Sequence, residues 1–120
     1  MHELSLAMEI IRIADEQAAL HQANGVEKIC VEIGQLAGVE IEALKFALEH
    51  GRQNTVLQNT EINYRILEGR GKCQTCDLEF SVDTWWVSCP ICGSSAIQIV
   101  QGDEFRVREL TLTLPQPSEN

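Results

Sequence analysis

Basic side chains are scarce in this chain. Nine lysine and arginine residues stand against eighteen aspartate and glutamate residues, and the formal net charge at pH 7 is −9. A protein that binds nucleic acid needs a surplus of positive charge, because it must neutralise phosphates. The balance argues against a nucleic-acid-binding protein and favours a soluble protein that meets cations or a basic protein surface.

Long apolar runs and targeting signals are missing too. No uncharged apolar stretch is long enough to cross a membrane, and the sequence starts without the basic flank and apolar core of a signal peptide. We therefore expect a cytoplasmic protein that makes no membrane contact. Since thiols stay reduced in the cytoplasm, the five cysteines indicate metal binding rather than disulfides.

Catalytic motifs are also absent. The sequence contains no H-E-x-x-H motif, no glycine-rich phosphate loop and no nucleophile–base pair. His21 and His50 fall at the ends of predicted helices, where a solvated cation complements the helix dipole. We therefore predict that the protein is not an enzyme.

Hydrophobic periodicity predicts two helices. Apolar residues recur at spacings of three and four from Leu4 to about Ala23, with Asn24-Gly25 as the expected stop. The face expected to be buried consists of Leu4, Met8, Ile11, Ala14 and Ala18. A second helix is predicted over residues 40–50 and should bury Leu44, Ala47 and Leu48.

Alternating apolar residues predict three strands. They cover residues 26–33, 62–66 and 105–114, and the last strand slips in phase by one residue around Arg108-Glu109, which indicates a bulge. The strands should pair in one sheet. The predicted fold class is α/β (α+β), with a small mixed three-stranded sheet, two helices and an inserted zinc-ribbon domain.

The composition changes at Gly69-Arg70-Gly71, where a cysteine-rich segment begins. Because the strand after Gly102 resembles the first two, this segment is interpreted as an insertion into the α/β domain. We expect an α/β domain from residues 1–68 and 102–114, a zinc-ribbon domain over 69–101 and a flexible tail over 115–120.

Four cysteines form two C-x-x-C pairs, Cys73/Cys76 and Cys89/Cys92, separated by twelve residues. Each pair is typical of a tight knuckle, and two facing knuckles build a tetrahedral four-sulfur site. Structural zinc is the expected occupant, and it would act as a folding element because so short a segment buries little surface. A rubredoxin-like iron centre, an iron–sulfur cluster and a reactive dithiol are the alternatives.

Other residues support the cysteine segment. Gly93 permits the positive φ that is often needed after a knuckle, and Trp85-Trp86 are expected to provide apolar cover. The fifth cysteine, Cys30, lies on a predicted strand, where an inert buried thiol is the expected role.

The chain begins Met1-His2-Glu3, which is a candidate nickel site. The Met1 amine, the His2 amide and the His2 ring can close a five-membered and then a six-membered chelate ring around one ion. That arrangement suits a cation that prefers square-planar nitrogen ligands, namely Ni²⁺ or Cu²⁺.

The Met1-to-Ser5 start, the Glu32-Ile33-Gly34 strand end, the two C-x-x-C knuckles and Gly102-Asp103-Glu104 together resemble the HypA/HybF family of hydrogenase nickel-incorporation proteins. The order of these parts matches over essentially the whole chain. The resemblance implies a nickel-binding α/β domain with an inserted zinc ribbon. It further implies delivery of Ni²⁺ to the precursor of the NiFe-hydrogenase large subunit with a GTPase accessory protein, and some members also supply urease.

Carried over to this sequence, the resemblance implies that Met1, His2 and Glu3 bind nickel, with Glu3 acting through its amide or carboxylate. It implies that Cys73, Cys76, Cys89 and Cys92 bind structural zinc. Histidines flank the knuckles in some relatives, whereas this chain has residues such as Asp77 and Gly93 there.

Two competing functions are weighed against nickel delivery. A zinc-ribbon module acting on nucleic acid conflicts with the acidic balance, and a redox dithiol protein conflicts with a zinc-filled site. The sequence does not reveal which enzyme receives the nickel or whether the protein forms a homodimer.

Overall fold

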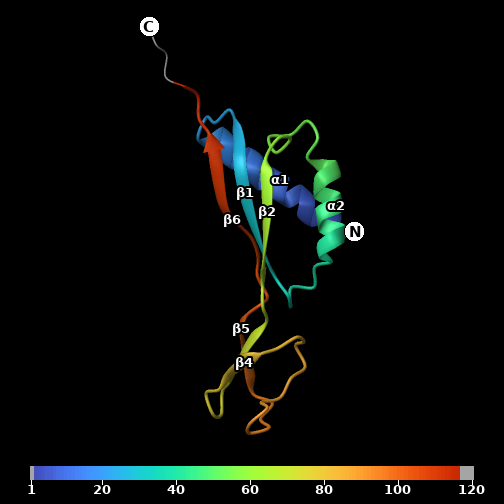
Figure 1. The fold of residues 1–120 in the computed structure, drawn as a ribbon, viewed down its shortest axis with the longest axis vertical. Coiled ribbons are helices and arrows are strands. Elements are labelled where there is room, and N and C mark those ends of the chain that lie inside the picture. Colours follow the sequence, from blue (N-terminus) through green and yellow to red (C-terminus); the bar gives the residue numbers. More distant parts are fainter. Residues whose placement is uncertain (1, 117–120) are drawn as a thin grey trace. The chain divides into compact units, whose positions relative to one another are not determined.

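The computed structural model describes residues 2–116 and has two helices and six strands in that range (Figure 1). In chain order these are α1 (His2–Leu20), β1 (Gly25–Gly34), α2 (Ile41–Gly51), β2 (Glu61–Leu67), β3 (Arg70–Cys73), β4 (Glu79–Ser81), β5 (Ile97–Gln101) and β6 (Phe105–Thr113). The strands form two three-stranded sheets with the orders β2-β1-β6 and β4-β3-β5. The expected fold class, including the pairing of the last strand with the first two, is confirmed. Met1 of the expected nickel site and residues 117–120 of the expected tail lie outside the described residues.

The described chain divides into two compact units. One contains residues 2–31, 40–63 and 107–116, and the other contains 32–39 and 64–106. The first unit carries both helices, and the second carries the four cysteines of the two C-x-x-C motifs. Within the described residues, neither helix has the length and apolarity needed to cross a membrane.

The first helix ends earlier than predicted. Gln22 adopts a positive φ of 54°, the Ala23 amide donates to the Ala18 carbonyl at 2.8 Å, and the Gln22 amide donates to Ala19 at 3.2 Å. These two bonds form a Schellman cap, which satisfies the last helical carbonyls. The expected stop at Asn24-Gly25 is therefore wrong, and Gly25 already begins β1.

The buried face of α1 also differs from the predicted one. Leu4 and Met8 are 51% and 58% exposed, so their assignment to the core is wrong. The residues that α1 buries are Ala7, Ile10, Ile11, Ala14 and Ala18. Both stripes follow the helical repeat, but this one carries two isoleucines and small alanines that permit close packing between α1 and α2. Leu44 and Leu48 of α2 are buried as predicted, while Ala47 is half-buried.

The last residues of β1 are buried on both faces. Glu32 is buried among them, and its carboxylate accepts a bond from the Arg106 guanidinium at 2.7 Å. Arg65 Nη1 approaches the second carboxylate oxygen at 3.4 Å. Since Arg65 and Arg106 belong to the strands on either side of β1, the triad links the three strands of the sheet. A buried carboxylate is tolerated here because both of its oxygens are paired with cations.

Three glycines meet within the second unit, where the chain enters and leaves the small sheet. A Cβ on Gly34 would lie 2.0 Å from the Gly102 carbonyl oxygen, and one on Gly69 would lie 2.2 Å from the Val82 carbonyl oxygen. Gly102 has a φ of 116°, and its carbonyl accepts the Leu36 amide at 2.7 Å. Glycine is required at these positions because backbone occupies the space of a side chain.

The small sheet is antiparallel on both sides of β3. Gly71 lies opposite Phe80 of β4 and opposite Ile99 of β5. The Trp85 indole donates to the Leu36 carbonyl at 3.0 Å, but Trp86 is 90% exposed. The expectation that both tryptophans cover the lobe is therefore wrong for Trp86, which projects into solvent.

Candidate metal centre

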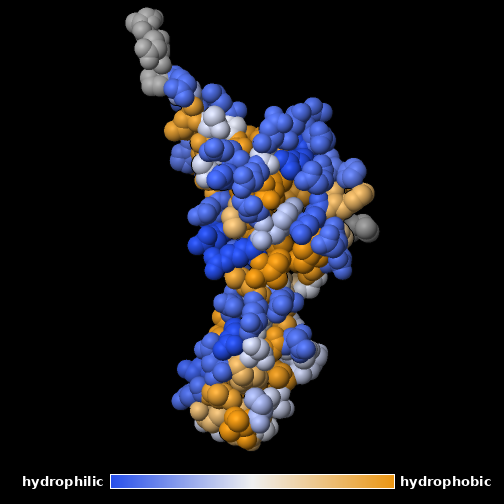
Figure 2. All heavy atoms as spheres, in the orientation of Figure 1, coloured by the Kyte–Doolittle hydropathy of each residue, from blue (hydrophilic) through white to orange (hydrophobic). Residues whose placement is uncertain are grey.

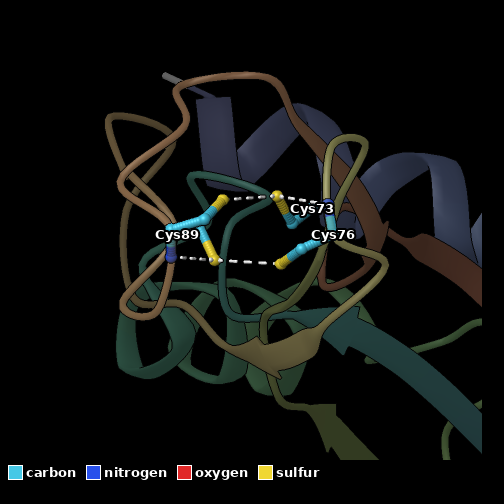
Figure 3. Close-up of side chains that lie close together, drawn as sticks. Cys73, Cys76 and Cys89 are labelled. Carbon is cyan, nitrogen blue, oxygen red and sulfur yellow. Dashed lines mark hydrogen bonds between the residues drawn. The ribbon is translucent and has the colours of Figure 1, made fainter.

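Four cysteine side chains converge at one end of the small sheet. Cys73 is the last residue of β3 and Cys76 lies in the turn after it, while Cys89 and Cys92 belong to the loop before β5. Their four sulfur atoms all lie within 4.8 Å of one another. Figure 3 shows the sulfurs of the two knuckles pointing toward each other across a small gap. The cluster is thus a candidate metal site built from the two predicted knuckles.

The spacing of the sulfurs fits a tetrahedral ion. Cys73 Sγ lies 3.6 Å from Cys92 Sγ, and Cys76 Sγ lies 3.6 Å from Cys89 Sγ. A tetrahedron with zinc–sulfur bonds of about 2.3 Å has edges of about 3.8 Å. These separations are far too long for a disulfide, and all five cysteines are free thiols. The donor set therefore fits a soft, tetrahedral metal ion.

The same backbone turn shapes both knuckles. The Asp77 amide donates to the Cys73 carbonyl at 2.9 Å, and the Gly93 amide donates to the Cys89 carbonyl at 3.0 Å. Asp77 and Gly93 both have positive φ, at 64° and 77°. The interpretation of Gly93 is confirmed, and aspartate takes the same left-handed conformation in the first knuckle, where it is one of the residues that tolerate it.

Hydrogen bonds from backbone amides influence the ionisation of the cysteine thiols. The Cys76 amide donates to Cys73 Sγ at 3.4 Å and is the largest influence lowering the pKa of Cys73 to about 6. The Cys92 amide donates to Cys89 Sγ at 3.5 Å and likewise lowers the pKa of Cys89. For Cys76 the Leu78 amide favours the thiolate, but burial and the neighbouring sulfurs outweigh it and raise the pKa to about 12. One sulfur of each knuckle is therefore prepared for ionisation, and a bound cation must displace the protons of the other two.

Apolar residues surround this site. Figure 2 shows them in orange on the face of the unit that carries the cysteine loops. Cys73 and Cys89 are buried, whereas Cys76 and Cys92 are exposed. A partly buried thiolate cluster of this kind is shielded from water on one side only.

The other candidate site is the start of α1. His2 is exposed, and its Nδ1 lies 3.5 Å from Glu3 Oε2. The same carboxylate oxygen accepts the Glu40 amide at 3.0 Å. Glu40 is the N-cap of α2, and its own carboxylate accepts the Glu42 amide at 3.2 Å. The structure thus joins His2 and Glu3 to the N-terminus of α2, while the Met1 amine expected beside them lies outside the described residues.

The link between Glu3 and Glu40 could not be expected from the sequence. The two residues are 37 positions apart, so no local pattern connects them. The bond to the Glu40 amide is the largest cause of a lowered pKa at Glu3, followed by the bond to its own amide. The contact therefore favours the ionised carboxylate beside His2.

A pH-dependent effect follows from the Glu3 contact. A carboxylate whose pKa is lowered by folding stabilises the protein above its unfolded pKa, and this stabilisation is lost as pH falls through the folded pKa. We expect Glu3→Gln to lower the urea midpoint at pH 7, and the two curves should converge once the pH falls below the ordinary value of 4.5. Urea titrations at several pH values measure this. Glu3→Asp keeps the charge but shortens the reach, so a midpoint equal to that of wild type would show that the contact with Glu40 contributes nothing.

Comparison with known proteins points to one family. Residues 1–112 match the family model described as "Hydrogenase/urease nickel incorporation, metallochaperone, hypA". A Parabacteroides distasonis protein called hydrogenase maturation factor HypA is 38% identical over 112 residues, which are 93% of this chain and 97% of that protein. A Psychromonas ingrahamii protein of the same name is 37% identical over 110 residues, covering 92% and 96% of the two chains.

Solved structures share the fold. The solution structure of the Ni metallochaperone HypA from Helicobacter pylori has a TM-score of 0.67 at 23% identity and covers 94% of this chain and 98% of that one. A second solution structure, of a HypA protein, has a TM-score of 0.71 at 25% identity and covers 96% and 98%. The family match extends over nearly the whole chain, from the start of α1 through both knuckles to β6. This chain belongs to the HypA family of nickel-incorporation metallochaperones.

Proposed function

We propose that this protein binds Ni²⁺ at its N-terminus and delivers it to the precursor of the NiFe-hydrogenase large subunit. The ligands are the Met1 amine, the His2 amide and the His2 ring, with Glu3 beside them. The six-membered ring of such a chelate requires Nδ1 of His2. The observation that carries the proposal is the His2–Glu3–Glu40 cluster, in which this nitrogen lies 3.5 Å from a carboxylate oxygen held by the α2 N-cap.

The position of His2 at the start of a helix supports this chelate. The first four amides of a helix have no carbonyl partner within the helix, and α1 begins at His2. Ni²⁺ can therefore replace the proton of the His2 amide without breaking a helical hydrogen bond. Because the ring is exposed, the ion can also leave by losing one ligand at a time, as a carrier requires.

The helix dipole opposes a cation at this end, but the effect is small. It disfavours a positive charge by about 0.3–1 kcal/mol, whereas a micromolar site corresponds to about 8 kcal/mol. The ionised Glu3 carboxylate and the deprotonated amide act in the other direction. The proposed site therefore has modest affinity, and the helix dipole does not prevent nickel from binding there.

The four-cysteine cluster is proposed to hold structural zinc. Four thiolates that surround the ion leave no open coordination position, so the metal would supply folding energy rather than catalysis. Cys73, Cys76, Cys89 and Cys92 would bind it. Nickel at the N-terminus and zinc at the cysteines would then differ in ligand chemistry, since amine, amide and imidazole nitrogens suit Ni²⁺ and thiolates suit Zn²⁺.

The proposal also includes where the protein acts and with which partners. The protein acts in the cytoplasm together with a GTPase accessory protein and catalyses no reaction itself. Urease is a second recipient consistent with the family description, which names hydrogenase and urease together.

Nickel titration by calorimetry tests the proposal. Untagged, zinc-loaded protein is compared with His2→Ala and with a version extended by Gly-Ser before Met1. We expect stoichiometric binding in the parent protein and its loss in both variants, with unchanged zinc content. His21→Ala is the matched control, because His21 is an exposed histidine beyond the other end of α1.

Equal nickel binding in all of these proteins would refute the N-terminal chelate. Loss of nickel in Cys30→Ser or in His21→Ala, but not in His2→Ala, would place the site elsewhere.

A further inference from the structure

The surface of the first unit has an open apolar hollow between α1 and α2. Its volume is about 490 Å³. It is lined by Glu3, Leu4, Ala43, Phe46, Ala47, His50 and Gly51. Every α2 residue in this set except Gly51 falls on one helical face, since 43, 46, 47 and 50 are three or four positions apart. We call this hollow the interhelical groove.

Large apolar side chains border the interhelical groove and remain accessible. Phe46 is 67% exposed, and Leu4 of α1, which also lines the groove, is 51% exposed. An exposed apolar patch on an acidic, highly charged protein is a mark of an interaction surface. Leu4, one of the two α1 residues mispredicted as core, thus lines this groove.

The groove wall is partly fixed in advance. The His50 ring packs on the Phe46 ring with centroids 4.2 Å apart, and His50 Nδ1 lies 3.0 Å from the Phe46 carbonyl oxygen. Both contacts restrain the two aromatic side chains. A preformed wall loses less side-chain entropy when a partner binds.

The two helices that form the groove carry more acidic than basic residues. The α1 helix carries four carboxylates and one arginine, and α2 with its N-cap carries three carboxylates and one lysine. Arg12 pairs with Glu9 and Glu16, and Lys45 pairs with Glu42. A second copy of this chain or an anionic membrane would meet like charge on these two helices.

We propose that the interhelical groove binds an amphipathic helix of a partner protein whose apolar residues are flanked by lysine and arginine. The eight residues from Ala43 to His50 span seven helical steps, or about 10 Å, which matches two turns of a docked helix with anchors at i, i+4 and i+7. Since Glu3 lines the groove, the helix would lie next to the nickel chelate. The inference that this partner exchanges nickel rests on the proposed function, whereas the docking surface does not.

A designed peptide pair tests the surface. The probe is a fluorescein-labelled, 18-residue leucine–lysine amphipathic peptide, and the comparison is the same peptide with glutamate in place of lysine. Fluorescence anisotropy with the full, zinc-loaded protein should show binding of the basic peptide only. Phe46→Ser and Leu4→Ser should each weaken it about tenfold, as expected for anchor contacts.

Leu20→Ser is the matched control, because Leu20 is an equally apolar residue of α1 that is 70% exposed and absent from the groove lining. It should leave peptide affinity unchanged. Equal affinity in Phe46→Ser, Leu4→Ser and Leu20→Ser would mean that only general charge attraction holds the peptide, and it would overturn the proposal. Sedimentation that shows a dimer of the free protein weakened by Phe46→Ser would assign the groove to a second copy and overturn it as well.

His2→Ala separates this proposal from the nickel site. The variant should bind the basic peptide with wild-type affinity even though nickel binding is lost. If His2→Ala binds nickel normally while the groove variants lose the peptide, the nickel assignment fails and the docking surface stands.

Discussion

The Cys76→Ser variant is expected to lose its metal and to unfold the small sheet. Cys76 is exposed, so exchanging sulfur for oxygen creates no cavity in the core, and the effect arises from the lost ligand alone. The apparent binding free energy of small structural zinc sites is about 10–16 kcal/mol. That is more than the second unit can replace, because Val82 and the two knuckle cysteines are its only buried apolar side chains among residues 70–106 of the described chain.

Amide hydrogen exchange and metal analysis measure this effect. Protection should disappear at Gly71 and Lys72, which are paired with β4 and β5, and should persist at Ile29 and Val31 in the core of the first unit. Cys30→Ser is the control that removes a thiol outside the cluster, and it should keep one metal ion per chain. Full protection of β3 in metal-free protein would show that the metal is not a folding element.

The Gly34→Ala variant is expected to be destabilised by about 3 kcal/mol, at the upper end of the range for overpacking. Its new methyl group would lie 2.0 Å from the Gly102 carbonyl oxygen and 2.7 Å from the Asp103 nitrogen. Both of these atoms belong to the backbone of residues 102–103. This segment is held in place by hydrogen bonds, because the Gly34 amide donates to the Glu104 carbonyl and the Leu36 amide donates to the Gly102 carbonyl. The clash therefore cannot be relieved by rotating a side chain.

Urea unfolding monitored by circular dichroism measures the change. Gly25→Ala is the paired control at the other end of β1, where an added Cβ meets nothing within 4 Å. There the substitution should be neutral or stabilise by about 0.4–1 kcal/mol, because it reduces the entropy of the unfolded chain. A similar loss in both variants would mean that strand propensity, and not the close approach to Gly102, determines the result.

Patterns that are local in sequence predicted most elements of the fold. The alternation in β1 and β6 and the C-x-x-C spacing each depend on neighbouring residues, and the structure contains the expected strands and knuckles. The phase slip at Arg108-Glu109 also appears in the burial of β6, where both residues are exposed. The bulge itself stays a prediction.

Features that depend on residues far apart were not predictable in this way. Two overlapping stripes on α1 obey the helical repeat, and only the tertiary packing of the helix decides that Ala7 and Ile10 are buried while Leu4 and Met8 are not. The Glu3–Glu40 bond and the burial of Glu32 between Arg65 and Arg106 likewise require tertiary neighbours. The metal ligands proposed at the N-terminus were predicted from chelate chemistry and from the family resemblance, and they await the nickel titration.

Both tryptophans of this chain, Trp85 and Trp86, lie in the unit that carries the cysteine cluster. Excitation at the red edge of the absorption band therefore yields emission from this unit only, with no label required. Trp86 is nearly fully exposed and should emit as a hydrated indole in any state, whereas Trp85 loses its bond to the Leu36 carbonyl when the unit opens. We therefore expect the emission of Trp85 to change when a metal ion leaves the cysteines, while Trp86 serves as an internal reference.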